Sequence, residues 1–132
     1  MFTLDIQTSK EKEVYDLTDD VNSLLKKSPV DEGLCTVFVK HTTAALTVAD
    51  MDPGAEEDYL KAFEKLIPDI NYKHPHDPDH MPDHIMGALM NPSISIPIDS
   101  SQLDLGTWQR LVLMDFSGPR KRTVRVIVTK GS

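Results

Sequence analysis

The residues best suited to chemistry lie in one short stretch of the chain. Residues 72–84 (YKHPHDPDHMPDH) hold four of the five histidines, together with three prolines and three aspartates. Pro75, Pro78 and Pro82 fix φ and remove backbone donors, so the stretch is predicted to be a stiff loop and not one helix face. Imidazole titrates near neutral pH and is the commonest metal ligand, which indicates a metal or acid–base site. A polar proline-rich connection can also be histidine-rich without a function, because composition alone is weak evidence for metal.

The fifth histidine, His41, follows the apolar run 34–39 and precedes Thr42 and Thr43. The run is predicted to be a strand buried on both faces, and a second strand is expected after His41. The small residues that follow would let a ligand or another backbone come close. Taken alone, a histidine at such a junction is more often a satisfied polar group than a ligand.

A cationic turn follows Pro119, where Arg120, Lys121 and Arg122 are consecutive. The guanidinium fork suits two-point contact with phosphate or carboxylate. A solvated basic turn is the simpler interpretation of this segment alone.

A glycine turn followed by an aromatic residue and an amide occupies Gly106 to Gln109. Trp108 and Gln109 could line a pocket for a flat ring. A single tryptophan at the start of a strand is, however, usually part of the core.

Composition excludes several classes of function. Lys and Arg number 14 against 21 Asp and Glu, so the net charge is 14 − 21 = −7, which argues against binding of a nucleic-acid backbone. The one cysteine, Cys35, lies in an apolar run and is expected to be buried and inert, which fits a reducing compartment. The N-terminus lacks the pattern of a signal peptide, and no apolar run approaches the length of a bilayer span. The sequence therefore predicts a soluble cytoplasmic protein with no membrane partner.

The elements that must position these residues follow from hydrophobic periodicity. Strands are expected at 2–6 and near Val14 and helices at 18–27 and 53–67, with Thr18 and Asp52 as their N-caps. Asp83 is expected to cap a short helix over 84–90. Further strands are expected at 94–98, 108–116 and 123–129, the last two paired as a hairpin. A length of 132 residues fits one domain, spanning 1–132. The predicted fold class is α+β, mostly antiparallel sheet in two layers with two or three short helices.

Several of these motifs occur together, in order, in a known family. They are HTTAALTV at 41–48, Asp52-Pro53, Tyr72-x-His74, His84 before a short helix, LGTWQ at 105–109 and GPRKR at 118–122. On these motifs the chain resembles the YjbQ family, described as the secondary thiamine-phosphate synthase enzyme family, over essentially its whole length. The resemblance implies a compact α+β domain that forms a homotrimer, with a histidine-lined site near the subunit boundary that holds zinc or another divalent metal.

The resemblance also implies roles for individual residues. His41, His74 and His84 match the family's histidines and are the expected metal ligands and catalytic residues, whereas His76 and His80 rank lower. Asp50 and Asp58 are also expected to be catalytic. Asp58 matches a carboxylate position of the family. Asp50 departs from the pattern, because members commonly read Asn-Glu where this chain has Ala49 and Asp50 and is one residue shorter. The residues expected to bind substrate are Thr42, Thr43, Trp108, Gln109, Arg120 and Arg122.

The implied reaction joins a pyrimidine diphosphate to a thiazole phosphate with weak activity, and the ligand is a small phosphorylated heterocycle. A site for this reaction must neutralise the departing diphosphate and hold two rings in line. Three neutral imidazoles on one metal leave a coordination position open for water or substrate. The same residues would equally serve a non-catalytic trimeric metal- or ligand-binding protein, or a metal-dependent phosphate-ester hydrolase.

Overall fold

A computed structural model describes residues 1–75 and 77–132, so His76 lies outside the described residues. In chain order the elements are β1 (Phe2–Gln7), β2 (Glu13–Asp16), α1 (Thr18–Leu25), β3 (Gly33–Val39), β4 (Ala44–Ala49), α2 (Ala55–Leu66), the 3-10 turn η1 (Pro78–His80), α3 (Met81–Met90), β5 (Ser93–Asp99), β6 (Gln102–Leu103), β7 (Arg110–Asp115) and β8 (Lys121–Lys130). Among the described residues, no helix is long and apolar enough to cross a membrane.

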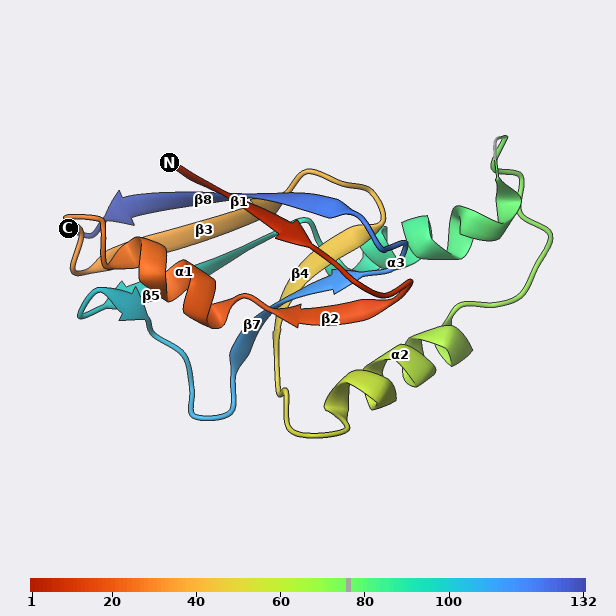
Figure 1. The fold of residues 1–132 in the computed structure, drawn as a ribbon, viewed down its shortest axis with the longest axis horizontal. Coiled ribbons are helices and arrows are strands. Elements are labelled where there is room, and N and C mark those ends of the chain that lie inside the picture. The colour runs from red at the N-terminus through yellow and green to blue at the C-terminus, as the bar shows by residue number, and fades with distance from the viewer. Residues whose placement is uncertain (76) are drawn as a thin grey trace.

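The strands form two antiparallel sheets (Figure 1). The five-stranded sheet has the order β1-β8-β3-β5-β6, and the three-stranded sheet has the order β2-β7-β4. The prediction of a single-domain α+β fold built on antiparallel sheet is confirmed.

The main core lies where the inner faces of both sheets and α1 meet. Alternate residues of β3 and β8, such as Val37 and Val126, pack in one cluster with Leu46 and Leu113 of the small sheet. Leu17, Val21 and Leu25 bring α1 against the same cluster. In β8 the period-two alternation that predicted the strand also selects its buried side, with Val124 and Val126 in the core.

The other face of the small sheet is covered by α2 and α3. Val112 and Met114 of β7 form a second cluster there, against which Leu60, Phe63 and Ile67 pack as expected. Figure 1 shows α2 and α3 on the same side of the molecule, joined by the segment that carries the histidines.

The expectation that strand 34–39 is buried on both faces was wrong. Cys35 and Val37 are buried, but Leu34 and Phe38 are 41% and 42% exposed on the outer face of the large sheet. Ile127 on β8 is 44% exposed on that face, beside Thr36 in the strand pairing. An apolar run thus marked a strand with one covered face and one open face.

The predicted hairpin between 108–116 and 123–129 was also wrong. β7 pairs with β2 and β4, whereas β8 pairs with β1 and β3. The turn at Ser117 to Arg120 therefore carries the chain from the small sheet to the large one. Both strands have apolar inner faces, and sequence alternation does not show which sheet a strand joins.

The predicted N-caps were wrong in detail. Leu17, Gly54 and His80 occupy the cap positions of α1, α2 and α3, and none makes a side-chain capping hydrogen bond. The predicted loop also ends early, because the chain is helical from Pro78 through η1 and α3. His84 therefore lies inside α3, whereas the sequence placed it at the start of that helix.

Candidate functional site

A buried ion pair joins the two sheets at the turn between β7 and β8. Arg122 on β8 is 1% exposed, and its Nη2 donates to Asp115 Oδ1 at 2.5 Å. The same nitrogen lies 2.9 Å from Thr43 Oγ1 and 3.3 Å from the Ser117 carbonyl oxygen. The prediction that Arg122 binds the anionic part of the ligand does not agree with this burial, because its cation is paired with Asp115.

Asp115 is fully buried, and three different groups hydrogen-bond to its carboxylate. Burial raises its pKa, but hydrogen bonds from Arg122, Thr8 Oγ1 and the Ser117 N–H outweigh burial, so the net pKa lies below its usual value. Thr43, predicted to bind substrate, is buried and gives both of its oxygens to Arg122. Together these groups hold the β7–β8 turn against the β3–β4 connection.

His41 lies at the same end of the molecule, between β3 and β4. Its Nε2 accepts the backbone N–H of Thr123 at 2.9 Å, so in the neutral ring the hydrogen is on Nδ1. Burial lowers the pKa of His41, and the nearby cations Arg122 and Arg120 lower it further. The sequence predicted a histidine at the junction of two strands, and the structure shows its imidazole hydrogen-bonded to the backbone of β8.

His74 and His84 form a stacked pair. Their ring centroids are 5.0 Å apart, with an angle of 21° between the planes. The Nδ1 of His74 accepts the backbone N–H of Asp77 at 3.2 Å. One turn beyond His84, Gly87 packs so tightly on the Thr42 carbonyl that a Cβ there would lie 2.4 Å from its oxygen. The structure therefore brings His74 and His84 together and places α3 beside Thr42.

These donors do not fit a three-histidine metal centre within one chain. Among residues 1–75 and 77–132, no group of three or more His, Cys, Asp or Glu side chains is arranged to hold a metal ion. A neutral imidazole has one lone pair, and in His41 and His74 a backbone N–H already occupies it. Metal binding by His41, His74 and His84 remains a prediction.

His80 ranked below His41, His74 and His84 as a predicted ligand, but three polar side chains surround its ring. Its Nε2 lies 3.1 Å from Asp77 Oδ2, and its Nδ1 lies 3.5 Å from Ser117 Oγ and 3.8 Å from Asp83 Oδ2. Arg120 Nη2 reaches the same Ser117 oxygen at 3.4 Å. The β7–β8 turn, η1 and the start of α3 thus meet at Ser117.

Lys12 joins this group from the β1–β2 connection. Its Nζ donates to Asp83 Oδ1 at 2.8 Å and to the Phe116 carbonyl oxygen at 2.9 Å. We call Lys12, His41, His80, Ser117 and Arg120 the turn cluster. The sequence marked Arg120 and His41, but Lys12 and Ser117 lie in segments that gave no signal beyond charge and turn propensity.

The remaining predicted residues lie at the opposite end of the small sheet. Asp50 and Trp108 line an open hollow of about 320 Å³ with Asp16, Asp52 and Arg110 among its other residues. Trp108 is 69% exposed in the turn before β7, so the long buried strand expected from Trp108 was wrong at its start. Gln109 folds back, and its Oε1 accepts the Gly106 N–H at 2.8 Å.

The length of β4 separates these two groups of residues. Ala44 pairs with Asp115 at one end of the strand pair, and Ala49 pairs with Arg110 at the other. At about 3.3 Å per residue, the strand keeps Trp108 and the turn cluster roughly 20 Å apart. Asp58, the other predicted carboxylate, is exposed in the first turn of α2. One chain therefore does not gather all the predicted residues into one site.

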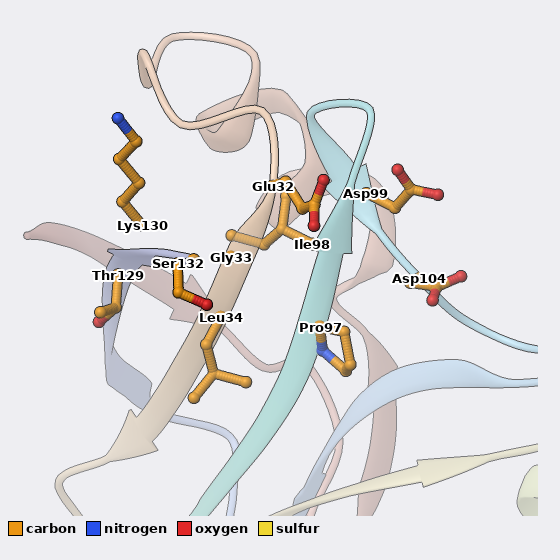
Figure 2. Close-up of a pocket in the computed structure, with 11 residues that line it drawn as sticks. Glu32, Gly33, Leu34, Pro97, Ile98, Asp99, Asp104, Thr129, Lys130 and Ser132 are labelled. Carbon is orange, nitrogen blue, oxygen red and sulfur yellow. The ribbon is translucent and has the colours of Figure 1, made fainter.

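A further hollow lies elsewhere and is lined by none of the predicted residues. It has a volume of about 620 Å³ and is lined by the ends of β3, β5 and β8 (Figure 2). Figure 2 shows the side chains of Glu32, Asp99 and Asp104 around it, with Lys130 on the far side of β3. The hollow is wide and open, and its acidic lining does not suit a phosphorylated ligand.

Comparison with known proteins identifies the family of the chain. The family model described as "UPF0047 protein YjbQ-like" matches residues 2–131. The chain belongs to the YjbQ family. A UPF0047 protein of Archaeoglobus fulgidus is 38% identical over 126 residues, which cover 95% of this chain and 96% of that protein. A UPF0047 protein of Mycobacterium bovis is 37% identical over 132 residues, with coverage of 97% and 99%.

Solved structures of YjbQ-like proteins share the architecture. An uncharacterized protein of the family from Clostridium acetobutylicum superposes with a TM-score of 0.89 at 34% identity, covering 98% of this chain and all (100%) of that one. A YbjQ-like protein of unknown function from Sulfolobus solfataricus gives a TM-score of 0.91 at 28% identity, with coverage of 98% and 96%. These names identify a family and do not state a reaction.

Proposed function

We propose that this YjbQ-family chain binds a small phosphorylated heterocycle at the turn cluster and acts as a transferase of the thiamine-phosphate synthase type. The observation that supports this most directly is the grouping of cationic and imidazole side chains there. Arg120, Lys12 and His41 come from three different connections and surround one turn of a protein whose net charge is −7. A local cationic patch is what an acidic protein needs to hold an anion.

Each group in the cluster has a task in such a reaction. Arg120 is exposed, and its guanidinium offers a planar fork for the oxygens of a departing diphosphate. His41 presents Nδ1–H as a further donor, because Nε2 is fixed by Thr123. The buried Arg122–Asp115 pair holds the turn that carries Arg120, so the donors are positioned before the ligand arrives.

The ring-binding half of the proposal requires residues from the opposite end of the small sheet. Trp108 offers an exposed aromatic face for a heterocycle, but the length of β4 separates it from Arg120 within one chain. We therefore propose that the active form is the homotrimer, in which residues of neighbouring chains complete the site. The open apolar side chains Leu34, Phe38 and Ile127 on the large sheet are consistent with burial of that face in an assembly.

A substrate panel tests the proposal. The purified protein is given a pyrimidine diphosphate with a thiazole phosphate, and both ring coupling and phosphate release are scored, while calorimetry measures binding of the thiazole phosphate alone. Arg120→Ala should weaken that binding by about 1.5 to 3 kcal/mol, the value of a charge-assisted hydrogen bond. Lys27→Ala is the control, because Lys27 is an exposed cation just beyond the end of α1, outside the turn cluster and the open face of the large sheet.

The panel has three informative outcomes. Ring coupling that falls in Arg120→Ala and persists in Lys27→Ala supports the synthase. Binding without turnover of any kind would replace it with a non-catalytic ligand-binding protein. Equal affinity in Arg120→Ala and wild type would show that the cluster does not bind the phosphate.

A further inference from the structure

Three side chains of the turn cluster and its surroundings have the connectivity of an activated serine. Ser117 Oγ is 3.5 Å from one ring nitrogen of His80, and Asp77 Oδ2 is 3.1 Å from the other. A nucleophile, a base within hydrogen-bond reach and a carboxylate that orients the base form the usual arrangement for nucleophilic catalysis, and these contacts are often long before substrate binds. We propose that Ser117 is a nucleophile that accepts a phosphoryl group from a small phosphate monoester, with His80 as its general base.

The orientation of His80 is set from both sides. Asp77 Oδ1 accepts the Asp79 N–H at 3.1 Å, which fixes the carboxylate whose other oxygen meets His80 Nε2. With the ring hydrogen on Nε2, the lone pair of Nδ1 points to Ser117. Asp83 also faces Nδ1, at 3.8 Å, but its carboxylate is paired with Lys12 at 2.8 Å. Nδ1 is therefore available as the base for Ser117.

The backbone of Ser117 is held rigidly. Its N–H donates to Asp115 Oδ1 at 3.0 Å, and its carbonyl oxygen accepts from Arg122 at 3.3 Å. Ser117 is 5% exposed, whereas the His80 side chain is 46% exposed and Arg120 is open to solvent. A substrate therefore approaches over His80 and Arg120. The buried ion pair thus positions the nucleophile, as a catalytic group requires.

The donors near Ser117 favour a phosphoryl group over an acyl group. Backbone N–H groups commonly stabilise an acyl oxyanion, but those of Ser117, Gly118 and Arg120 are taken by Asp115, the Glu11 carbonyl and Thr8 Oγ1. The remaining donors are cationic. Arg120 Nη2 lies 3.4 Å from Ser117 Oγ, and Lys12 has three N–H donors, two of which bond to Asp83 and Phe116. Arginine and lysine are the groups that stabilise a transferring phosphoryl group.

The reaction balances without any further reagent. Ser117 Oγ forms a bond to phosphorus as the bond from phosphorus to the alcohol oxygen breaks. The Ser117 proton passes to His80 Nδ1 and then to the leaving alkoxide. Water, deprotonated by the same nitrogen, then attacks the phosphorus of the phosphoserine as the bond from phosphorus to Oγ breaks. The proton on His80 Nδ1 passes to the Ser117 alkoxide, which releases inorganic phosphate and restores Ser117. This hydrolysis does not depend on the ring-coupling function proposed above.

Acid quenching followed by peptide mass spectrometry tests the inference directly. The wild-type protein is mixed with p-nitrophenyl phosphate in the presence of a chelator, so that a metal-dependent hydrolase does not contribute. We expect one phosphoryl group on the peptide that contains Ser117, because phosphoserine survives acid whereas phosphohistidine does not. The label should be absent from Ser117→Ala and retained in Ser23→Ala, a control on α1 away from the cluster.

The role of His80 is tested by rate. His80→Gln should lower the release of p-nitrophenol by about 10²- to 10⁴-fold, the usual contribution of general base catalysis. Ser23→Ala should keep the wild-type rate. Absence of label on wild-type Ser117, or label that persists in Ser117→Ala, would overturn the proposal.

Discussion

Replacement of Arg122 by methionine should destabilise the protein strongly. The change keeps a long side chain but removes the cation, and it leaves the Asp115 carboxylate fully buried with only Thr8 and the Ser117 N–H as donors. Breaking a buried ion pair by removing one partner costs about 3 to 5 kcal/mol, because the remaining charge is uncompensated. Urea unfolding with linear extrapolation should therefore show a loss of that size in the free energy of unfolding at neutral pH.

A second ion pair provides the control. Arg110 Nε lies 2.7 Å from Asp16 Oδ2, at a closely similar distance, but both side chains are about one third exposed. Exposed pairs contribute about 0 to 1 kcal/mol, so Arg110→Met should cost much less than Arg122→Met. Equal costs for the two variants would refute the argument that burial makes the Arg122 pair important.

The pH dependence gives an independent check of the same reasoning. The pKa of Asp115 in the folded wild type is below its usual value, about 3.9 in unfolded chains, so its stabilisation is present above that pH and is lost as pH falls through the folded pKa. In Arg122→Met burial prevails and should raise the pKa of Asp115. The difference in stability between wild type and variant should then be largest near pH 7 and should shrink as pH approaches 4. A difference that does not change between pH 7 and pH 4 would show that Asp115 is not the group responsible.

Three further predictions concern the metal, the cysteine and the assembly. If His41, His74 and His84 bind a divalent metal such as zinc, each His→Ala variant should lose metal in elemental analysis; wild type without metal would end that hypothesis. Burial raises the pKa of the Cys35 thiol to about 11, so it should react with a thiol reagent only at the rate of unfolding, and fast labelling in the native protein would contradict this. Light scattering should give the mass of a trimer, and Phe38→Asp should shift it to a monomer if the open face of the large sheet is the interface.

Much of the fold could be predicted because the strands and helices have strong local patterns. Alternation marked β1, β5 and β8, and the apolar stripe Leu60, Phe63 and Ile67 marked the buried side of α2. The pairing of strands could not be predicted in the same way. β7 and β8 are consecutive and both apolar, but they separate into different sheets, which depends on how all the strands compete for partners.

The site could be predicted only in part for a related reason. His41 and Arg120 became candidates because they match motifs of the family, since the local sequence around each fits a hydrogen-bonded histidine and a solvated basic turn equally well. Ser117 and Asp115 gave no such signal, since a serine before Gly-Pro indicates a turn and an aspartate after an apolar strand indicates its end. Both residues are linked to Arg122, whose buried guanidinium donates to the Asp115 carboxylate and to the Ser117 carbonyl oxygen. These contacts exist only in the folded chain.

The separation of Trp108 from the turn cluster gives the last prediction. If one small ligand touched both within a single chain, the losses in binding free energy from Trp108→Ala and Arg120→Ala would be coupled. The two residues lie at opposite ends of β4, roughly 20 Å apart, and residues without shared partners at more than 7 to 10 Å usually add within about 0.3 to 0.5 kcal/mol.

A double-mutant cycle on a monomeric variant should therefore be additive for binding of the thiazole phosphate. In the assembled protein the same cycle should show coupling, because the proposed synthase needs the ring and the phosphate of one substrate to be held together. Mixing Trp108→Ala chains with Arg120→Ala chains should then restore ring coupling in part, since some sites would combine an intact Trp108 from one chain with an intact Arg120 from another. Additivity in both states, with no restoration on mixing, would show that Trp108 does not belong to the site at the turn cluster.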